Sequence, residues 1–410
     1  MLAPLMAVLI ATGSVGETLR VPDQFAAVSD ALAEATSGDR IVVAPGRYGA
    51  ETGEDLPWRL AGRDVIIEGA GAGRTVLTGD RVSRLLEFSE GDRSVVRGFT
   101  LRDARAETAG GAVLVDGASP ELLGLHFTAN ESAGGGDALL LRSGVPRVAN
   151  CLFDRNGVQG PTVVVRAGSP ILEHLTFHGN GGPALEVHDD ASPFLHQSII
   201  CRPGARGGDA IGIRVVTGRG LGALMLEENL FSECFDGAVS IRGGSHPIVS
   251  DLRQDARSSG GMREGDPRFV DPGAGDFRLE DTSPARSFRG ADAQLGAFGG
   301  RSPLLLDRSS AAANAGEALP RLLGPSVPNP FTPATTIHFT VEETGVVDLG
   351  VYNVLGQRIR TLHSGGLTEG DHSRVWDGRD ELGADAPPGI YFVRVTQGEV
   401  TESRRVVLVR

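Results

Sequence analysis

The chain has 410 residues, more than a single domain usually contains, and a formal net charge of −13. No stretch is basic, so nucleic acid is not expected as a partner, because neutralising phosphates requires clusters of lysine or arginine. All 39 side chains counted as lysine or arginine are arginine, which excludes Schiff-base chemistry and lysine general bases.

The first 16 residues predict a signal peptide. Residues Met1–Thr12 form an apolar run that ends in Gly13-Ser-Val-Gly16, like the hydrophobic region and small-residue cleavage site of a secretory signal. We therefore expect a secreted or cell-surface location. The run is too short to span a bilayer and no other stretch is long enough, so no membrane span is expected.

A short amphipathic helix is predicted next. Phe25, Val28 and Leu32 share one face, with Asp23 as a candidate N-cap and Gly38 as the stop signal. Such a helix can cover the open end of a repeat structure and protect its backbone edges from pairing with another molecule.

One short sequence motif recurs with a period of about 24 residues, which predicts a solenoid. The three copies are Phe127-Thr-Ala-Asn130, Phe153-Asp-Arg-Asn156 and Phe177-His-Gly-Asn180. A unit this short cannot bury its own apolar face, so it must stack on its neighbours in parallel coils. Because strand residues alternate faces, Phe127, Phe153 and Phe177 should form one inward column. Turn chemistry predicts that Asn130, Asn156 and Asn180 form a structural ladder at one corner.

The outward columns of the same coils contain the candidate site. Arg166, Glu186, His188 and Arg214 are expected to meet on one face, which makes them the weak catalytic candidates. Arg142, Arg166 and Arg214 are the candidates for binding an acidic glycan. The alternative is a solvated face of Arg–Glu and Arg–Asp pairs, each worth little. Leu114, Leu140 and Val164 are expected to form an exposed apolar row.

Other reactive side chains give weaker signals. His174, His178 and His196 fall in different columns, so no metal site is predicted, although calcium stays open. Cys151 lies in an inward column and is expected to be a buried thiol, while a disulfide between Cys201 and Cys234 is left open. The repeat wall lacks Trp and Tyr from Gly110 to Gly244, which argues against a strong groove for neutral glycans there.

Residues 18–300 resemble the right-handed parallel β-helix repeat family of the pectate-lyase-like superfamily. The resemblance rests on the repeat, on an entry segment at 21–48, and on Asp266-Pro-Arg-Phe-Val-Asp-Pro272 and Leu295-Gly-Ala-Phe-Gly-Gly300 as an exit. Some relatives cleave acidic polysaccharides by using calcium-bound carboxylates and an arginine base, and others use carboxylate pairs. Neither catalytic arrangement is recognisable as a sequence motif in this chain. The resemblance therefore implies only the general location of a site, on the wall of the β-helix.

The last part of the chain predicts a second domain. Residues 301–324 lack strand alternation and suit a linker, and residues 325–410 contain short alternating strands with turn residues between them, typical of an antiparallel β-sandwich. Asp377, Asp380, Glu381 and Asp385 suggest calcium ligands, but polar hairpin residues explain them better because no ligand spacing repeats.

Four sequence motifs, which occur in the same order in this region, resemble those of the immunoglobulin-like domain of flagellar hook-capping proteins and of type-nine secretion sorting domains. They are Pro328-Asn-Pro-Phe-Thr-Pro333, Val351-Tyr-Asn-Val-Leu-Gly356, Trp376-Asp-Gly-Arg-Asp380 and Pro388-Gly-Ile-Tyr391. The resemblance implies an address tag or docking module that engages secretion or sorting machinery. The chain departs from sorting domains that end in a Lys-containing tail, since this one ends in arginines.

We therefore predict an all-β protein. A signal peptide (1–16) precedes a right-handed parallel β-helix with a helical cap (17–300), a linker (301–324) and an Ig-like sorting or docking domain (325–410). The leading functional hypothesis is a secreted or cell-surface structural or adhesion protein, more a binder than an enzyme. Its partner would be an acidic polysaccharide or a surface protein. The rival hypothesis is a polysaccharide lyase or glycoside hydrolase that acts on an acidic glycan.

Overall fold

The computed structural model describes residues 16–216, 224–241, 244–246, 262–286, 294–299, 304, 323–327, 331–341, 344–353, 357–398 and 400–408. The chain divides into two compact units, Met1–Ala312 and Ala313–Arg410. The prediction of an all-β chain, with a parallel β-helix before a small antiparallel sandwich, is confirmed. The expected signal peptide lies outside the described residues except for Gly16. So do most of the expected linker and parts of the first two Ig-like motifs.

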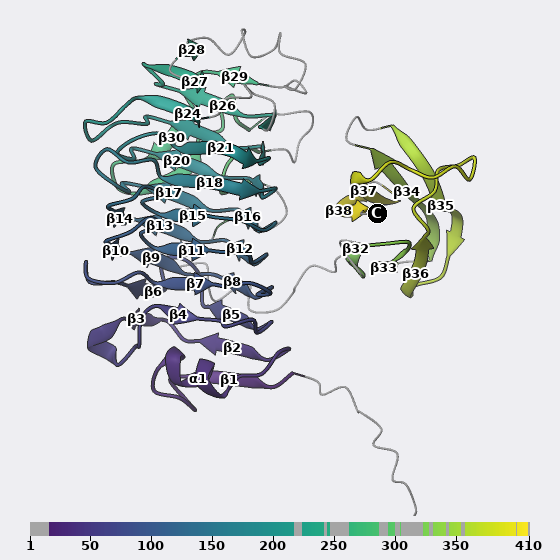
Figure 1. Ribbon diagram of the computed structural model, residues 1–410, viewed down its shortest axis with the longest axis horizontal. Helices are drawn as coiled ribbons and strands as arrows, with labels where there is room; N and C mark the ends of the chain where they lie inside the picture. The colour runs from purple at the N-terminus through teal and green to yellow at the C-terminus, as the bar shows by residue number, and fades with distance from the viewer. Residues whose placement is uncertain are drawn as a thin grey trace, which may run out of the picture. The chain divides into compact units, whose positions relative to one another are not determined.

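Three nine-stranded sheets form the walls of the β-helix, and their strands stack in chain order along the coil (Figure 1). Sheet A contains β1 (Thr18–Val21), β2 (Arg40–Val43), β5 (Ile66–Gly69), β8 (Val95–Arg97), β12 (Glu121–Leu123), β16 (Arg147–Ala149), β19 (Ile171–Glu173), β22 (Phe194–His196) and β25 (Met225–Glu227). Sheet B contains β3 (Gly46–Tyr48), β6 (Thr75–Thr78), β9 (Thr100–Arg102), β13 (His126–Thr128), β17 (Leu152–Asp154), β20 (Thr176–His178), β23 (Ile199–Cys201), β26 (Leu230–Ser232) and β29 (Arg263–Glu264).

Sheet C contains β4 (Trp58–Arg59), β7 (Leu86–Phe88), β11 (Val113–Val115), β15 (Leu139–Leu141), β18 (Val163–Gly168), β21 (Leu185–Ala191), β24 (Ile211–Val216), β27 (Gly237–Ile241) and β28 (Gly244–His246). Neighbouring strands pair in parallel, except that β28 runs antiparallel to β27. A small extra pair, β10 (Arg105–Ala106) with β14 (Glu131–Ser132), continues the same stacking between sheets B and C.

The core of the β-helix is built from like residues stacked on like. Phe127, Phe153 and Phe177 are opposite one another in sheet B, and their rings stack with centroids 4.6 Å and 4.8 Å apart. Leu122 and Val148 belong to a second buried column, on sheet A. Because each apolar side chain finds its equivalent one coil away, a short repeat buries its whole inner face.

The three asparagines lie one coil apart at the corner after sheet B and are fully buried. Asn130 donates from Nδ2 to Oδ1 of Asn156 at 2.9 Å, and Asn156 donates to Oδ1 of Asn180 at 3.1 Å. Each amide also donates to a strand carbonyl of the previous coil. The ladder therefore satisfies backbone groups at a corner where the preceding residue, such as Ala129 at φ 56°, is left-handed.

Helix α1 (Val28–Glu34) covers the first coil, but its ends differ from the expected ones. Its N-cap is Ala27, without a side-chain cap bond, and its C-cap is Ala35 rather than Gly38. The carboxylate of Glu54 takes the role expected of Asp23, because it accepts the amide protons of Val28 at 2.8 Å and Ser29 at 3.0 Å. A carboxylate 26 residues away thus caps the helix, which local sequence rules do not detect.

The exit segment folds back over sheet B. Strands β30 (Phe269–Asp271) and β31 (Asp276–Leu279) form a hairpin, and residues 294–299 follow along the same wall. Outward residues of sheet B, Leu152, Ile199 and Leu230, are buried under Phe277, Leu279, Leu295 and Ala297. Asn150 anchors this segment by donating to the carbonyl oxygens of Ala297 at 3.2 Å and Gly299 at 2.7 Å. The exit segment therefore covers these apolar residues of sheet B.

The second unit is a sandwich of two antiparallel sheets. One has the order β32 (Leu323–Val327), β33 (Thr335–Val341), β36 (Gly370–Trp376). The other has the order β35 (Arg358–Leu367), β34 (Gly345–Asn353), β37 (Gly389–Gln397), β38 (Val400–Leu408). Trp376 is fully buried between Phe331 and Tyr391, with ring centroids 5.2 Å and 4.9 Å away. Asp380 accepts the amide protons of Leu382 and Ala384, as a turn residue does.

Candidate functional site

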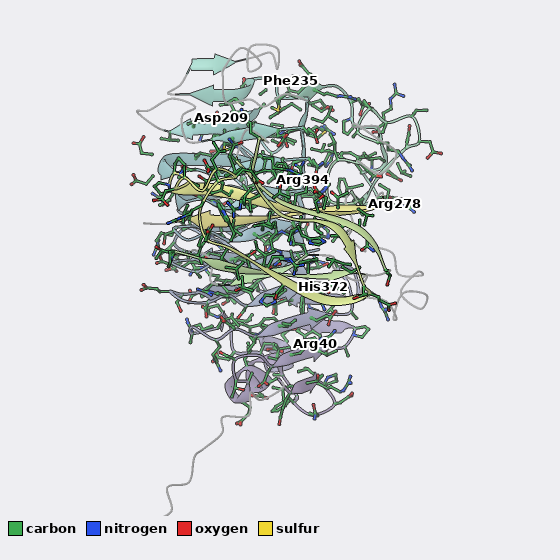
Figure 2. All side chains as sticks on the ribbon, turned by 90° about the vertical axis from the view of Figure 1, so that its right-hand side faces the viewer. Arg40, Asp209, Phe235, Arg278, His372 and Arg394 are labelled. Carbon is green, nitrogen blue, oxygen red and sulfur yellow. The ribbon has the colours of Figure 1, made fainter. Side chains whose placement is uncertain are left out.

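Three of the four predicted site residues meet on the outer face of sheet C. Glu186 on β21 is opposite Arg214 on β24, and its Oε2 lies 3.3 Å from Nη1 of Arg214. Its other oxygen, Oε1, lies 3.0 Å from Nε2 of His188. Arg214 also forms an ion pair with Asp209. Figure 2 labels Asp209 in the last coils, at the opposite end of the β-helix from Arg40.

Arg166 does not join this cluster. The register between β18 and β21 shifts between Val165 and Ala167, so Arg166 falls in an irregular step of the ladder. Its side chain is exposed and makes no ion pair within the described part of the chain. Arg142, the third glycan-binding candidate, is half-exposed and pairs with Asp116 at 2.7 Å. The three arginines therefore sit in three different electrostatic settings.

The expected exposed apolar row on sheet C is wrong. Leu140 and Val164 are buried, at 0% and 1% exposure, and Leu114 is half-buried. Glycine-rich turns of the coils lie over them, and a Cβ placed on Gly110 would be 3.1 Å from the Cβ of Leu140. The glycines allow the turns to approach this closely, so the coils themselves cover the row. It offers no apolar surface to a partner.

One of these turns contains a buried carboxyl group, Asp137. Its Oδ1 accepts the amide proton of Ser132 at 2.9 Å and the Ser132 hydroxyl at 3.1 Å. Its Oδ2 is buried without a hydrogen bond and faces Gly157 and Gly160, where an added Cβ would lie 1.9 Å and 2.7 Å away. Burial raises the pKa of Asp137 to about 6, against the opposing effect of the Ser132 hydrogen bonds.

A second polar cluster lies on the outer face of sheet A, which the sequence reasoning did not consider. Arg147 on β16 lies between Glu121 at 3.3 Å and Glu173, with which it forms a closer ion pair. His196 donates to Glu173 at 3.1 Å when protonated. Burial alone would raise the pKa of Glu173, but the hydrogen bond from His196 and the charge of Arg147 lower it to about 2.

The histidines are held by neighbours of different kinds. His174 follows β19 in a left-handed conformation with φ 50°, and burial lowers its pKa to about 4. Its ring centroid is 6.5 Å from that of His196. His178 instead faces outward from sheet B and packs against Phe269 and Phe277. Among the described residues, no group of three or more His, Cys, Asp and Glu side chains is arranged to hold a metal ion.

All three cysteines are free thiols in this structure. Cys151 is fully buried, and burial raises its pKa to about 12. Cys201 on β23 and Cys234 after β26 have pKa values raised to about 12 for the same reason. A thiol in this state is a weak nucleophile, so none of the three is suited to covalent catalysis.

In the described part of the chain no helix has the length and apolar character needed to cross a membrane.

Residues 332–399 match the FlgD Ig-like domain family. No curated protein matches the chain in sequence. Among solved structures, the PL6 family alginate lyase AlyGC aligns at 13% identity with a TM-score of 0.28, over 53% of this chain and 32% of the lyase. A mutant of the same lyase aligns at 10% identity with a TM-score of 0.23, over 70% and 57% of the two chains. The chain thus spans about a third to somewhat over half of the lyase chains' length, and the likeness transfers neither an activity nor a substrate.

Proposed function

We propose that the protein is a secreted or cell-surface structural or adhesion protein. In this proposal the β-helix presents a rigid wall to a partner, and the C-terminal Ig-like module sorts or docks the protein at its site of action. The observation that carries the proposal is the state of three candidate catalytic groups, Glu186, His188 and Arg214, which are engaged with one another rather than left available to a substrate.

Glu186 illustrates this state. One of its oxygens accepts from Arg214 and the other lies within hydrogen-bonding distance of His188, while Arg214 is also held by Asp209. A general base needs a lone pair directed at the substrate proton, and a substrate-binding arginine needs unshared N–H groups. A network of cross-coil ion pairs instead keeps a wall polar and soluble, with little effect on stability.

The module supports the second half of the proposal. Its core of Phe331, Trp376 and Tyr391 is separate from the β-helix core, and its family match is to an Ig-like domain named for FlgD. A domain with its own core can act as an independent attachment or sorting unit. The sorting role would involve secretion machinery as the partner of residues 325–410.

The test is a deletion of residues 325–410 in a cell that exports the full chain. We expect the truncated protein to keep its β-rich circular dichroism spectrum but to be lost from the cell surface or to accumulate inside. As a control, Val346→Thr changes an exposed residue of the module and should leave localisation unchanged. Normal surface localisation of the truncated protein would show that the module has no sorting or docking role.

A lyase or hydrolase acting on an acidic glycan is the second candidate. It is favoured by the 3.0 Å contact between Glu186 and His188, in which a carboxylate orients an imidazole on the outer face of sheet C. Purified protein should be incubated with uronate-containing polysaccharides, with and without calcium. Product that disappears in Glu186→Ala and Arg166→Ala, and persists in Arg142→Ala, would establish catalysis and overturn the leading proposal.

A further inference from the structure

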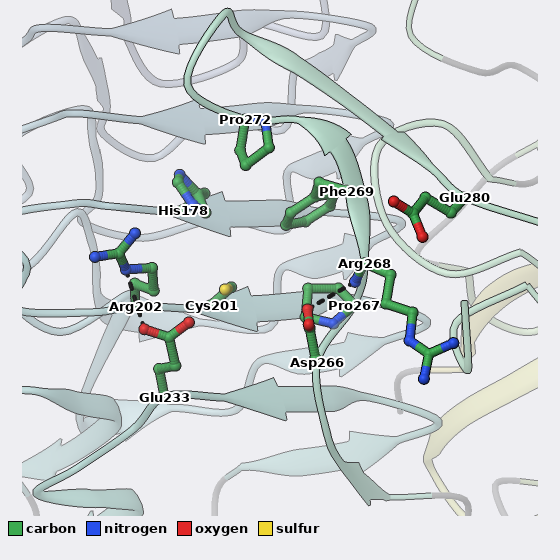
Figure 3. Close-up of a pocket in the computed structure, with 10 residues that line it drawn as sticks. All are labelled: His178, Cys201, Arg202, Glu233, Asp266, Pro267, Arg268, Phe269, Pro272 and Glu280. Atoms are coloured by element: carbon green, nitrogen blue, oxygen red, sulfur yellow. Dashed lines mark hydrogen bonds and ion pairs between the residues drawn. The ribbon is translucent and has the colours of Figure 1, made fainter. Parts of the chain in front are cut away.

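A cavity of about 420 Å³ lies where the exit segment crosses the C-terminal ends of β20 and β23 in sheet B (Figure 3). Outward residues of β20 and β23, His178 and Cys201, form one side, and the 266–272 stretch forms the other. The volume is near the small end of the ~300–1,000 Å³ usual for small-molecule sites. The cavity therefore suits one compact ligand rather than a segment of polymer, and it is distinct from the clusters on sheets A and C.

The apolar part of a mostly polar lining comes from Phe269 and two prolines. Phe269 is braced edge-on against Phe277, with centroids 5.5 Å apart, and against His178, with centroids 5.8 Å apart. Burial, followed by the charge of Arg202, lowers the pKa of His178 and so favours its neutral imidazole. Pro267 and Pro272 complete this surface. A half-buried aromatic ring flanked by prolines offers a flat apolar contact with little side-chain entropy to lose on binding.

The rim is charged and has unused hydrogen-bonding groups. Arg202 and Glu233 come from left-handed corner positions of adjacent coils, and Nε of Arg202 lies 3.1 Å from Oε2 of Glu233. Within the described residues, the two Nη groups of Arg202 and Oε1 of Glu233 make no other hydrogen bond. Asp266 accepts the backbone amide proton of Arg268 through Oδ1 at 2.8 Å, which leaves Oδ2 available. Figure 3 shows these pairs around the cavity.

The charges of the rim select among ligands. Arg202 and Arg268 supply two guanidinium groups to the lining, and Glu233, Asp266 and Glu280 supply three carboxylates, so the rim has a net charge of −1 with His178 neutral. Nη1 of Arg268 also donates to the carbonyl oxygen of Thr282 at 3.2 Å. A uronate or a phosphate would meet more negative than positive charge. Paired carboxylates and guanidinium groups can, however, accept from and donate to neighbouring hydroxyl groups, while Phe269 contacts C–H groups.

We propose that this cavity binds a single uncharged sugar ring, such as the terminal residue of a glycan. The polar rim engages the hydroxyl groups and the Phe269 side contacts the apolar face of the ring. This inference deepens the proposed adhesion function, on which it rests, because it names a ligand class and a place for it. Binding to the purified chain does not depend on localisation, so the two proposals can fail separately.

The test uses the full-length protein and the methyl glycosides of glucose, galactose and mannose. Saturation-transfer NMR should show saturable binding of at least one of them, and methyl glucuronide or galacturonide should bind more weakly. Asp266→Asn and Glu233→Gln keep the size of each side chain but remove its charge, and each should weaken binding by about tenfold or more. Asp281→Asn is the matched control, because Asp281 is exposed on the same segment outside the cavity.

Two results would overturn the inference. One is the absence of saturable binding by all three neutral glycosides. The other is binding that both cavity variants retain at the strength of Asp281→Asn, or that is tighter for the uronates than for the neutral sugars. The circular dichroism spectra and melting temperatures of the variants should match that of the parent, so that a loss of binding reports on the cavity rather than on folding.

Discussion

Sheets B and C have the same period and the same kind of inner column, yet their outer faces differ. On sheet B the outward residues Leu152, Ile199 and Leu230 are apolar, and the exit segment buries them. On sheet C the outward Glu186 and Arg214 are charged and partly exposed, with 16% and 27% of their side chains accessible. The inner column makes the β-helix in both cases, whereas the outer residues decide whether a wall becomes a second core or a surface.

The middle of sheet C is an intermediate case. Leu140 and Val164 are as apolar as the outward residues of sheet B, but glycine-rich turns of their own coils cover them. An apolar outward column therefore indicates that something covers it, and the cover can be local or distant. The following predictions test this difference between the walls, beginning with the largest expected effect.

Phe277→Ala should destabilise the β-helix by about 3–5 kcal/mol, because it removes a buried ring between the exit hairpin and sheet B. Denaturant unfolding of the full chain, followed by hydrogen exchange in β17, β20 and β23, measures the effect. Val216→Ala on sheet C, where the side chain is 45% exposed, is the control and should change stability by less than about 0.5 kcal/mol. Equal effects of the two substitutions would contradict the difference between the walls.

Asp137→Asn should remove a pH dependence from the turn that covers Leu140. The folded pKa, about 6, is raised above the reference value of 3.8, so the carboxyl group favours folding below pH 3.8. That contribution, at most about 3 kcal/mol, is lost as the pH rises through 6. Amide exchange of residues 131–137 should accelerate between pH 4 and 7 more steeply in the parent than in Asp137→Asn. Parallel profiles would refute the predicted titration.

His174→Gln should act in the opposite direction over nearly the same range. The folded pKa of about 4 is below the reference value of 6.5, so the unfolded chain binds a proton that the folded chain does not. The parent loses stability as the pH falls from 6.5 to 4, and the variant should be more stable by up to about 3 kcal/mol at pH 4. Gln197 already occupies the same left-handed corner one coil away, at φ 51°. Melting temperatures at pH 7 and pH 4.5 give the comparison.

Glu186→Gln should have the smallest effect on stability, about 0–1 kcal/mol, since its ion pairs lie on a partly exposed outer face. High salt should reduce the difference between the variant and the parent further. Chemical denaturation at low and high salt measures both effects. A loss above about 2 kcal/mol would mean that sheet C is covered in the functional state of the protein.

Periodicity predicted the fold well because the repeat encodes it directly. The Phe127–Phe153–Phe177 column follows from spacing alone, and the ordered motifs around Trp376 indicated the Ig-like domain. The helix cap was harder to predict, because its N-terminal partner, Glu54, is distant in sequence. Local sequence rules detect only caps that are adjacent to the helix.

The candidate site was predicted only in part. The alternation of strand residues placed Glu186, His188 and Arg214 on one face. The shift in the pairing of β18 with β21 at Arg166 could not be predicted, because alternation assumes a regular strand. The pairing of Arg147 with Glu121 and Glu173 on sheet A was accessible, because these residues follow the same aligned prolines. The cavity at His178 was not, because it requires the exit segment to return to coils about 90 residues earlier.

The two ends of the β-helix limit how it can assemble. At one end α1 lies over the first coil, and at the other β28 turns back antiparallel to β27, so the strand direction of sheet C is broken. Parallel in-register stacking between molecules, the geometry of fibre growth, requires a matching strand at each end. The stack of coils in the β-helix therefore ends within one molecule. We expect molecules of this protein to stay as discrete units rather than to polymerise end to end.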